Sequence, residues 1–494
     1  MTKSQSHIKF TFIAIGMIVM SSFYSQTTVH CYAPQFKGQI ARMTTYVDYL
    51  TFEKKELAKG IVDSTGHITF VVSEKQSQKA FIDIQDKSGT IYLDNNTPEY
   101  FVNFPYQHEN VQKLSDNTVQ MVFDSLQHND LNALILEFNI QLDYFLYGDT
   151  AKVQRLMLQN SLFRDSLGAF TEYIFNDYKD QTNIYFKNYM RYSIADVALY
   201  SNRQEPAKNK LVVFETFIKS RPILYKNEAY MTFIKNFYKD CMSDIAMIDR
   251  DKATTAVNTL QDFSRFSDVF STHYYLSNAT FSEFIMIISL SEAYHTTFYD
   301  RLVIRNFLNY IAHNGKFPSH KIMANNVLAV QEKLQIGNPV PKLNWISPQG
   351  DSLSLSDFKG KYVYLGFWAT WNPQSVQDIY MTKILEERYD KHIEFVSISI
   401  DNLPFKYEDF LTKNRDQKLD WNFGHYMGDS QVLEDFEIRS APSYFLIDPS
   451  GNLIQSPAYS PSPNGTYESI DETFHNIAKK LDPKRTIRIG SAEN

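Results

Sequence analysis

The order of strand and helix patterns in the C-terminal third of the chain restricts its fold more than any other feature. KYVYLGFWAT, residues 361–370, is a strongly apolar run typical of a strand buried on both faces. A helical pattern covers residues 376–389, and HIEFVSISID, residues 392–401, is a second apolar strand. The pattern continues with a helix over 406–414, two strands around a turn over 443–454 and a last helix over 468–481. This order predicts an α/β domain over residues 335–482.

Short alternating patterns fill residues 36–109. HITFVV, KAFIDIQ and TIYLDNN are separated by turn signals at residues 64–66 and 87–89. Tyr100, Val102 and Phe104 are spaced to share one face of a strand. These features predict a small antiparallel β-sheet domain.

Residues 110–334 have helical spacing and little proline. Met323, Val327, Val330 and Leu334 align on one helix face. We therefore expect a multidomain chain with a β domain, an all-α middle region and a C-terminal α/β domain. A loose tail is predicted over residues 483–494.

The first 26 residues have the features of a secretory signal peptide. Lys3 and Lys9 precede a run without charge over residues 10–20, which is too short to span a bilayer as a helix. We place cleavage between Ser22 and Thr28. Cys31 follows His30 rather than a small residue, which argues against lipidation. No later run is long enough to cross a membrane, so we expect an exported protein of the bacterial periplasm or cell envelope, without a membrane span after cleavage.

Composition excludes several classes of function. The chain has 49 Lys and Arg against 56 Asp and Glu, and no basic run with interleaved aromatics, so a nucleic-acid partner is not expected. Two cysteines are too few for a Cys-rich zinc site, and the histidines lack metal-site spacing. We predict neither a metal nor a cofactor. The 32 Tyr and 37 Phe favour bulky cores over a carbohydrate- or peptide-stacking surface.

Four stretches carry a family resemblance: GNPVPKLNWISPQGDSLSLSDFKGK, the strand ending in FWATW, SISID, and IRSAPSYFLIDPSG. In this order they resemble the TlpA-type envelope thioredoxin-like proteins, which reduce or exchange disulfides in the bacterial periplasm. The resemblance covers residues 337–481 and implies a thioredoxin fold. More loosely, the preceding residues look like the β-domain and helices that often precede such folds in Gram-negative envelope proteins, without assigned chemistry.

The resemblance places Asn372 and Ser375 where the family has the two cysteines of its Cys-x-x-Cys loop. Pro442 matches the family's cis-proline, and Asp378 stands where many members have a glutamate. Disulfide exchange needs a thiolate that forms a mixed disulfide and a second thiol that resolves it. Asn372 cannot do the first and Ser375 cannot do the second. The family label would be thiol-disulfide oxidoreductase, yet this loop is predicted to be redox-inactive.

Both replacements have a structural interpretation, which we favour over a new catalytic role. Asn is a preferred helix N-cap, and Pro373 would then occupy the first helical position. A nucleophilic Ser375 would need a nearby base, and His425 is the nearest histidine suggested by the fold. There is no Gly-x-Ser-x-Gly elbow, and we interpret His425 as an ordinary, partly exposed histidine. Asp378 is interpreted as a first-turn acid stabilised by the helix dipole.

A groove beside the cis-proline needs no sulfur, because the backbone there can pair with an extended peptide. Its candidate residues are Trp371, Pro373, Gln374, Ala441, Pro442 and Ser443. We expect Trp368 to pack in the core and Trp371 to be the more exposed of the two.

Three functions are therefore compared. The first is a redox-inactive binding or scaffolding module for a polypeptide or envelope protein, with the helical region supplying most of the surface. The second is an oxidoreductase that uses Cys31 and Cys241, whose pairing in a disulfide the sequence leaves open. The third is a hydrolase built on Ser375 or within the helical region, and no motif supports it.

Overall fold

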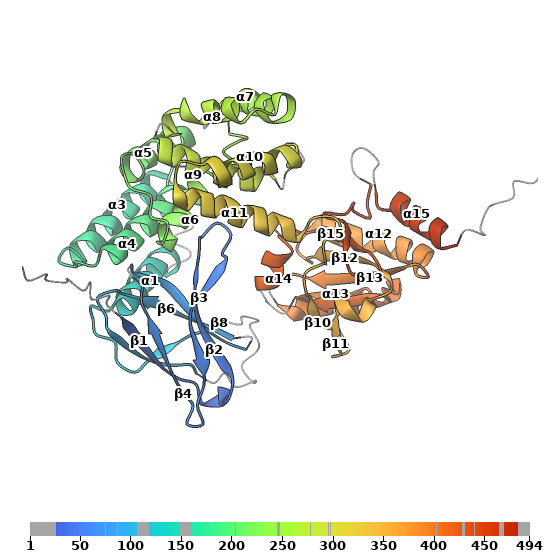
Figure 1. Ribbon diagram of the computed structural model, residues 1–494, viewed down its shortest axis with the longest axis horizontal. Helices are drawn as coiled ribbons and strands as arrows, with labels where there is room; N and C mark the ends of the chain where they lie inside the picture. The colour runs from blue at the N-terminus through green and yellow to red at the C-terminus, as the bar shows by residue number, and fades with distance from the viewer. Residues whose placement is uncertain are drawn as a thin grey trace, which may run out of the picture.

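The computed structural model describes residues 26–482 except 75, 86, 106–117, 149–159, 203, 245–247, 277, 295, 297, 402, 427–429, 439 and 464–468. Three regions follow one another along the chain: β sheets, helices, and a second sheet flanked by helices (Figure 1). The multidomain prediction is confirmed at this level. Apart from Gln26, the predicted signal peptide and the predicted tail lie outside the described residues.

Two sheets form the N-terminal region. One has the strand order β4-β1-β7-β9 and the other β3-β2-β5-β6-β8. Their inward side chains, among them Val29, Met43, Phe70 and Ile82, form one core, as in a β-sandwich. The strands are β1 (Thr27–Tyr32), β2 (Ile40–Tyr46), β3 (Lys54–Ile61), β4 (His67–Val72), β5 (Gln78–Ile84), β6 (Lys87–Leu93), β7 (Glu99–Asn103), β8 (Thr118–Val119) and β9 (Val122–Phe123).

The sequence prediction for this region needs two corrections. Its strands extend beyond residues 36–109 on both sides, because β1 precedes that range and β8 and β9 follow it. The sheets are also not purely antiparallel, since β1 runs parallel to β7 and β6 parallel to β8. Both pairs join strands distant in sequence, which alternation within one strand does not reveal. The shared inward face of Tyr100, Val102 and Phe104 is confirmed.

The middle region is helical, and its Asn and Asp residues have a clear local use. Side chains of Asp130, Asn183, Asn227, Asn278 and Asp300 each accept the backbone N–H that begins a helix. The helices are α1 (Leu131–Tyr147), α3 (Asn160–Asp177), α4 (Ile184–Ala198), α5 (Pro206–Phe217), α6 (Glu228–Phe237), α7 (Arg250–Thr254), α8 (Phe263–Ser271), α9 (Ala279–Ala293), α10 (Arg301–Asn314) and α11 (Pro318–Lys333). Within the described part of the chain, no helix is long and apolar enough to cross a membrane.

Polar contacts join the helical region to the sandwich. The Glu228 carboxylate on α6 accepts a hydrogen bond from Lys79 Nζ at 2.7 Å and another from the Tyr92 hydroxyl. Asn326 on α11 donates to the Asp48 carboxylate at 2.7 Å. These contacts link residues that lie far apart in the sequence, so the two regions pack as one unit.

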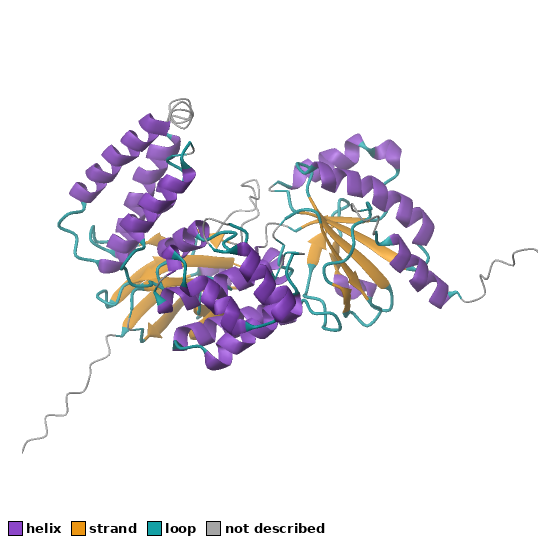
Figure 2. Ribbon diagram, turned by 90° about the horizontal axis from the view of Figure 1, so that it is seen from above, coloured by secondary structure: helices purple, strands orange, loops and turns teal. Residues whose placement is uncertain are grey.

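The C-terminal region is a seven-stranded sheet in the order β11-β10-β14-β13-β12-β15-β16. Central β12 runs parallel to β13 and antiparallel to β15. Leu365 and Phe367 of β12 pack on one face with Phe436, and Tyr364 packs on the other with Phe474. Helices therefore cover both faces of the sheet, as the apolar strands predict (Figure 2). The elements are β10 (Asn344–Ile346), β11 (Ser352–Ser354), β12 (Tyr362–Trp368), α12 (Pro373–Tyr389), β13 (Ile393–Ser399), α13 (Pro404–Lys413), β14 (Asn422–His425), α14 (Ser430–Asp435), β15 (Ser443–Ile447), β16 (Leu453–Gln455) and α15 (Asp471–Leu481).

The connection from α11 into this domain is ordered by backbone contacts. Leu334, just after α11, is buried in the core of the C-terminal sheet. The Gly337 N–H then donates to the Leu453 carbonyl at 2.8 Å, and the Val340 N–H donates to the Gly451 carbonyl at 2.9 Å. The linker motif GNPVP is thus paired along the edge at β16.

Candidate functional site

The loop between β12 and α12 contains no cysteine, and α12 begins there with an ordinary N-cap. Asn372 is the N-cap of α12, and its Oδ1 accepts the Ser375 N–H at 2.9 Å. Pro373 is the first helical residue, where its missing N–H leaves no bond unmade. The N-cap prediction for Asn372 is confirmed.

Asn372 also ties this loop to the proline loop across the site. Its Nδ2 donates to the Ala441 carbonyl at 2.9 Å. The Ala441–Pro442 peptide bond is cis, as the resemblance predicts. Ala441 is buried, whereas Pro442 and Ser443 are half-buried. One amide side chain therefore fixes both loops that border the candidate groove.

Ser375 has no catalytic environment. Its side chain is fully buried, and its hydroxyl has no hydrogen-bond partner among the described residues. A serine nucleophile needs a base within hydrogen-bond distance, and none is in place. The hydrolase hypothesis based on Ser375 therefore lacks its first requirement.

Asp378 corrects the sequence interpretation. It lies in the second turn of α12 and is fully buried, so it is not a first-turn acid facing the helix dipole. Its carboxylate accepts hydrogen bonds from Gln374 Nε2 at 2.8 Å, from the Tyr444 hydroxyl at 2.8 Å and from the Ser462 hydroxyl. The nearby carboxylate and burial raise the pKa of Tyr444 well above its ordinary value, burial being the larger cause. Asp378 thus joins α12 to strand β15 and to the segment that carries Ser462.

His425 is also buried, contrary to the interpretation of a partly exposed residue. Its Nε2 lies 2.6 Å from the Asp401 carbonyl, and its ring stacks on Tyr407. Burial lowers the pKa of His425, because it disfavours the imidazolium. His425 therefore has a packing role, and no hydrogen bond joins it to Ser375.

Asp401 is a site residue that the sequence reasoning missed. It is fully buried at the end of SISID, and its carboxylate accepts the Thr370 hydroxyl at 2.7 Å and the Thr370 N–H at 3.1 Å. The Ser399 hydroxyl donates to it at 2.8 Å. Asp401 thus fixes the turn that precedes Trp371. The sequence signal that could have identified it is an acidic residue at the end of a buried strand.

The two tryptophans differ as predicted. Trp368 is 1% exposed and packs edge-on against Phe410, whereas Trp371 is 59% exposed. Pro373 and Gln374 are exposed beside Trp371. Trp371 is therefore the large apolar side chain that this loop presents to solvent.

A cavity of about 620 Å³ lies beside the cis-proline. Gln374, Pro442 and Ser443 line it, so the structure brings together three of the six groove candidates. Tyr294 of the segment after α9 and Arg301 of α10 line the same cavity. The helical region thus contributes one wall, which no pattern within the C-terminal domain predicted.

Cys31 and Cys241 are separate from this site and from each other. Cys31 is buried in the sandwich core and Cys241 in the helical core, and both thiols are free. Burial raises the pKa of each thiol to about 12. Neither cysteine has the thiolate character or the access that disulfide exchange requires.

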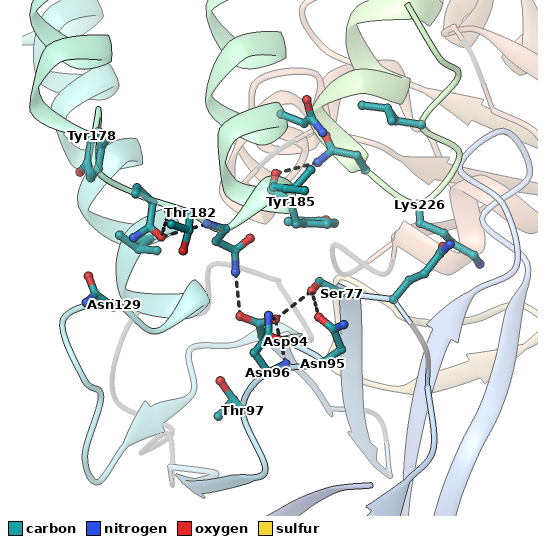
Figure 3. A pocket seen from close by; sticks show the side chains of 18 of the residues that line it. Ser77, Asp94, Asn95, Asn96, Thr97, Asn129, Tyr178, Thr182, Tyr185 and Lys226 are labelled. Carbon is teal, nitrogen blue, oxygen red and sulfur yellow. Dashed lines mark hydrogen bonds between the residues drawn. The ribbon is translucent and has the colours of Figure 1, made fainter. Parts of the chain in front are cut away.

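A second cavity, about 1390 Å³, lies where the sandwich loops meet the helical loops (Figure 3). Its polar side chains bond to one another. The Asn183 amide donates to the Asp94 carboxylate at 2.7 Å, and the Ser77 hydroxyl lies 3.0 Å from the same carboxylate and 3.1 Å from Asn95 Oδ1. The Asn183–Asp94 bond crosses the junction and helps to join the two regions, whereas the Ser77 contacts lie within the sandwich.

Comparison with known proteins agrees with the geometry of the C-terminal region. Residues 335–471 match the Redoxin family model. A thiol-disulfide oxidoreductase ResA from Bacillus thuringiensis is 29% identical over 127 residues, which are 25% of this chain and 70% of that protein. The ResA of Bacillus subtilis is 28% identical over 133 residues, covering 26% of this chain and 72% of that protein. The C-terminal region is thus thioredoxin-like and related to thiol-disulfide oxidoreductases.

Solved structures that are similar include a thiol:disulfide interchange protein from a Bacteroides species. It has 26% identity, covers 31% of this chain and 95% of that chain, and gives a TM-score of 0.25. A thioredoxin-like protein from Bacteroides caccae has 13% identity, covers 52% of this chain and 96% of that chain, and gives a TM-score of 0.32.

Proposed function

We propose that this chain is an exported binding protein of the bacterial cell envelope, redox-inactive at residues 372–375, that holds an extended polypeptide beside Pro442. The observation that carries the proposal is the pair of hydrogen bonds made by Asn372. One begins α12 and the other fixes the proline loop. The loop geometry is thereby kept without either thiol.

Two further features support peptide binding. Trp371 offers an exposed aromatic surface, and among the described residues the Ala441 N–H has no acceptor. A backbone donor without an acceptor among the described residues, on a loop bonded to the one that carries an exposed aromatic, suits an extended chain, which binds through main-chain hydrogen bonds. Because Asn372 already bonds the Ala441 carbonyl, we assign the Ala441 N–H as the principal main-chain contact.

Redox inactivity is tested by disulfide reduction of insulin with dithiothreitol. We expect the wild type and the Cys31→Ser/Cys241→Ser variant to match the uncatalysed rate. Asn372→Cys/Ser375→Cys is the positive control for a loop that regains two thiols. Wild-type turnover that is lost in the Cys31→Ser/Cys241→Ser variant would instead support the second hypothesis, an oxidoreductase using those cysteines.

Peptide binding is tested with a pool of random, biotinylated octapeptides captured on the folded protein. We expect Trp371→Ala to reduce the retained pool severalfold. Tyr173→Ala is the matched control, since Tyr173 on α3 is also 59% exposed. No retention by the wild type would reject the binding proposal.

Export is tested by fractionating a bacterium that expresses the full chain. The proposal expects the protein in the periplasmic fraction, with an N-terminus that begins between residues 23 and 28. An intact Met1 in the cytoplasmic fraction would reject it.

A further inference from the structure

The cavity beside Pro442 contains a guanidinium group whose hydrogen-bonding capacity is unused. Arg301 is half-buried, and its guanidinium lies over the Tyr294 ring, 5.3 Å from the ring centre. In the described part of the chain it has no carboxylate within ion-pair distance and donates no hydrogen bond. Arg305, one turn later, binds Glu332 at 2.7 Å. The contrast marks Arg301 as the arginine of this wall that is available to a ligand.

The position of Arg301 is unfavourable for the helix alone. It is the first residue of α10, where the helix dipole disfavours a positive charge. Stacking on Tyr294 holds the planar group but leaves its N–H donors unpaired. A positive charge at a helix N-terminus that has no partner among the described residues is most simply explained by a bound ligand.

The other charges around the cavity do not replace that partner. The Asp378 carboxylate is fully buried and accepts three side-chain hydrogen bonds. Asp300 uses its carboxylate to cap α10 through the Leu302 and Val303 N–H groups. Glu437 also lines the cavity and already has an interaction partner.

We propose that Arg301 binds a carboxylate side chain of the polypeptide that lies beside Pro442, so that the site selects extended segments with Glu or Asp at one position. The inference rests on the proposed function and adds the class of ligand. Guanidinium and carboxylate form two parallel charge-assisted hydrogen bonds, which combine strength with fixed geometry. The helical region thereby supplies the specificity of a groove built by the C-terminal domain.

The test uses the octapeptide pool, and the retained peptides are sequenced by mass spectrometry. We expect wild type to enrich Glu or Asp at one position by about tenfold, as a charge-assisted hydrogen bond of ordinary strength predicts. Arg301→Gln should remove the acidic enrichment while still retaining peptide. Arg301→Lys should keep part of it, because charge remains but the planar fork is lost. Higher salt should weaken the acidic enrichment.

Arg191→Gln is the matched control, because Arg191 on α4 is also half-buried and has no carboxylate partner among the described residues. It should leave the enrichment unchanged. Peptide retention without acidic preference, or a preference that survives Arg301→Gln, would overturn this inference and leave the binding proposal standing. Absence of any retained peptide would overturn both. Circular dichroism of each variant verifies that it is folded.

Discussion

The side-chain amide of Asn372 donates to the Ala441 carbonyl across 2.9 Å, although 69 residues separate the two in sequence. The same side chain begins α12 through the Ser375 N–H. A residue at this position thus sets both the direction of the helix and the position of the proline loop. Each function can be removed separately.

Replacing Asn372 tests this division. Asn372→Ala loses both bonds and should lower the free energy of unfolding by about 2 kcal/mol. Asn372→Asp keeps an acceptor for the cap but loses the donor to Ala441, so it should cost about 1 kcal/mol. Urea denaturation measures both values. No loss in Asn372→Asp would contradict a contribution from the Ala441 bond, and equal losses in the two variants would contradict a separate contribution from the cap.

Replacing Asp378 should be costly, because two buried hydroxyl donors lose their acceptor. Asp378→Ala leaves the buried hydroxyls of Tyr444 and Ser462 without an acceptor and removes the bond from the exposed Gln374 amide, and we expect a loss of about 3 kcal/mol in unfolding free energy. Asp409→Ala, at an exposed acid on α13, is the control and should change the thermal midpoint little. A small effect at Asp378 would mean that these contacts add little to stability.

The stability contributed by His425 should depend on pH in a defined direction. Burial lowers its pKa in the folded state, so the unfolded chain binds the proton more readily. This contribution is therefore complete above the ordinary pKa of about 6.5 and declines as pH falls below it, until the folded imidazole is protonated as well. His425→Phe lacks this titration. The free energy of unfolding of wild type minus that of the variant, measured by urea denaturation, should decrease as the pH is lowered from 8 to 5. A constant difference would contradict the assignment.

Both cysteines should be unreactive in the folded protein. Ellman's reagent should label neither Cys31 nor Cys241 on the minute timescale, because both thiols are buried and have a pKa raised to about 12. Unfolding in guanidinium without a reductant should expose two free thiols. Trp371→Cys is the control for an accessible thiol. Only one reactive group, or none, after unfolding would indicate that the cysteines are oxidised.

The sequence predicted the features that depend on short-range patterns. Apart from β14 and α14, which the sequence analysis did not place, the strand and helix order of residues 335–482 and the N-cap at Asn372 follow from neighbouring residues. The contacts of Asp378 did not, because Tyr444 and Ser462 lie 66 and 84 residues away. Arg301 belongs to another region altogether, so its place beside Pro442 depends on how two regions pack. Local periodicity contains no information about either.

Because Leu334 is anchored in the C-terminal core and Gly337 is bonded at the edge of the same sheet, α11 continues into this domain without a slack segment. Contacts with both regions therefore set the position of α11. On the other side, the Asn326 amide of the same helix donates to the Asp48 carboxylate of the sandwich. The fit of the helical wall that carries Arg301 against the loop of Pro442 therefore depends on both contacts.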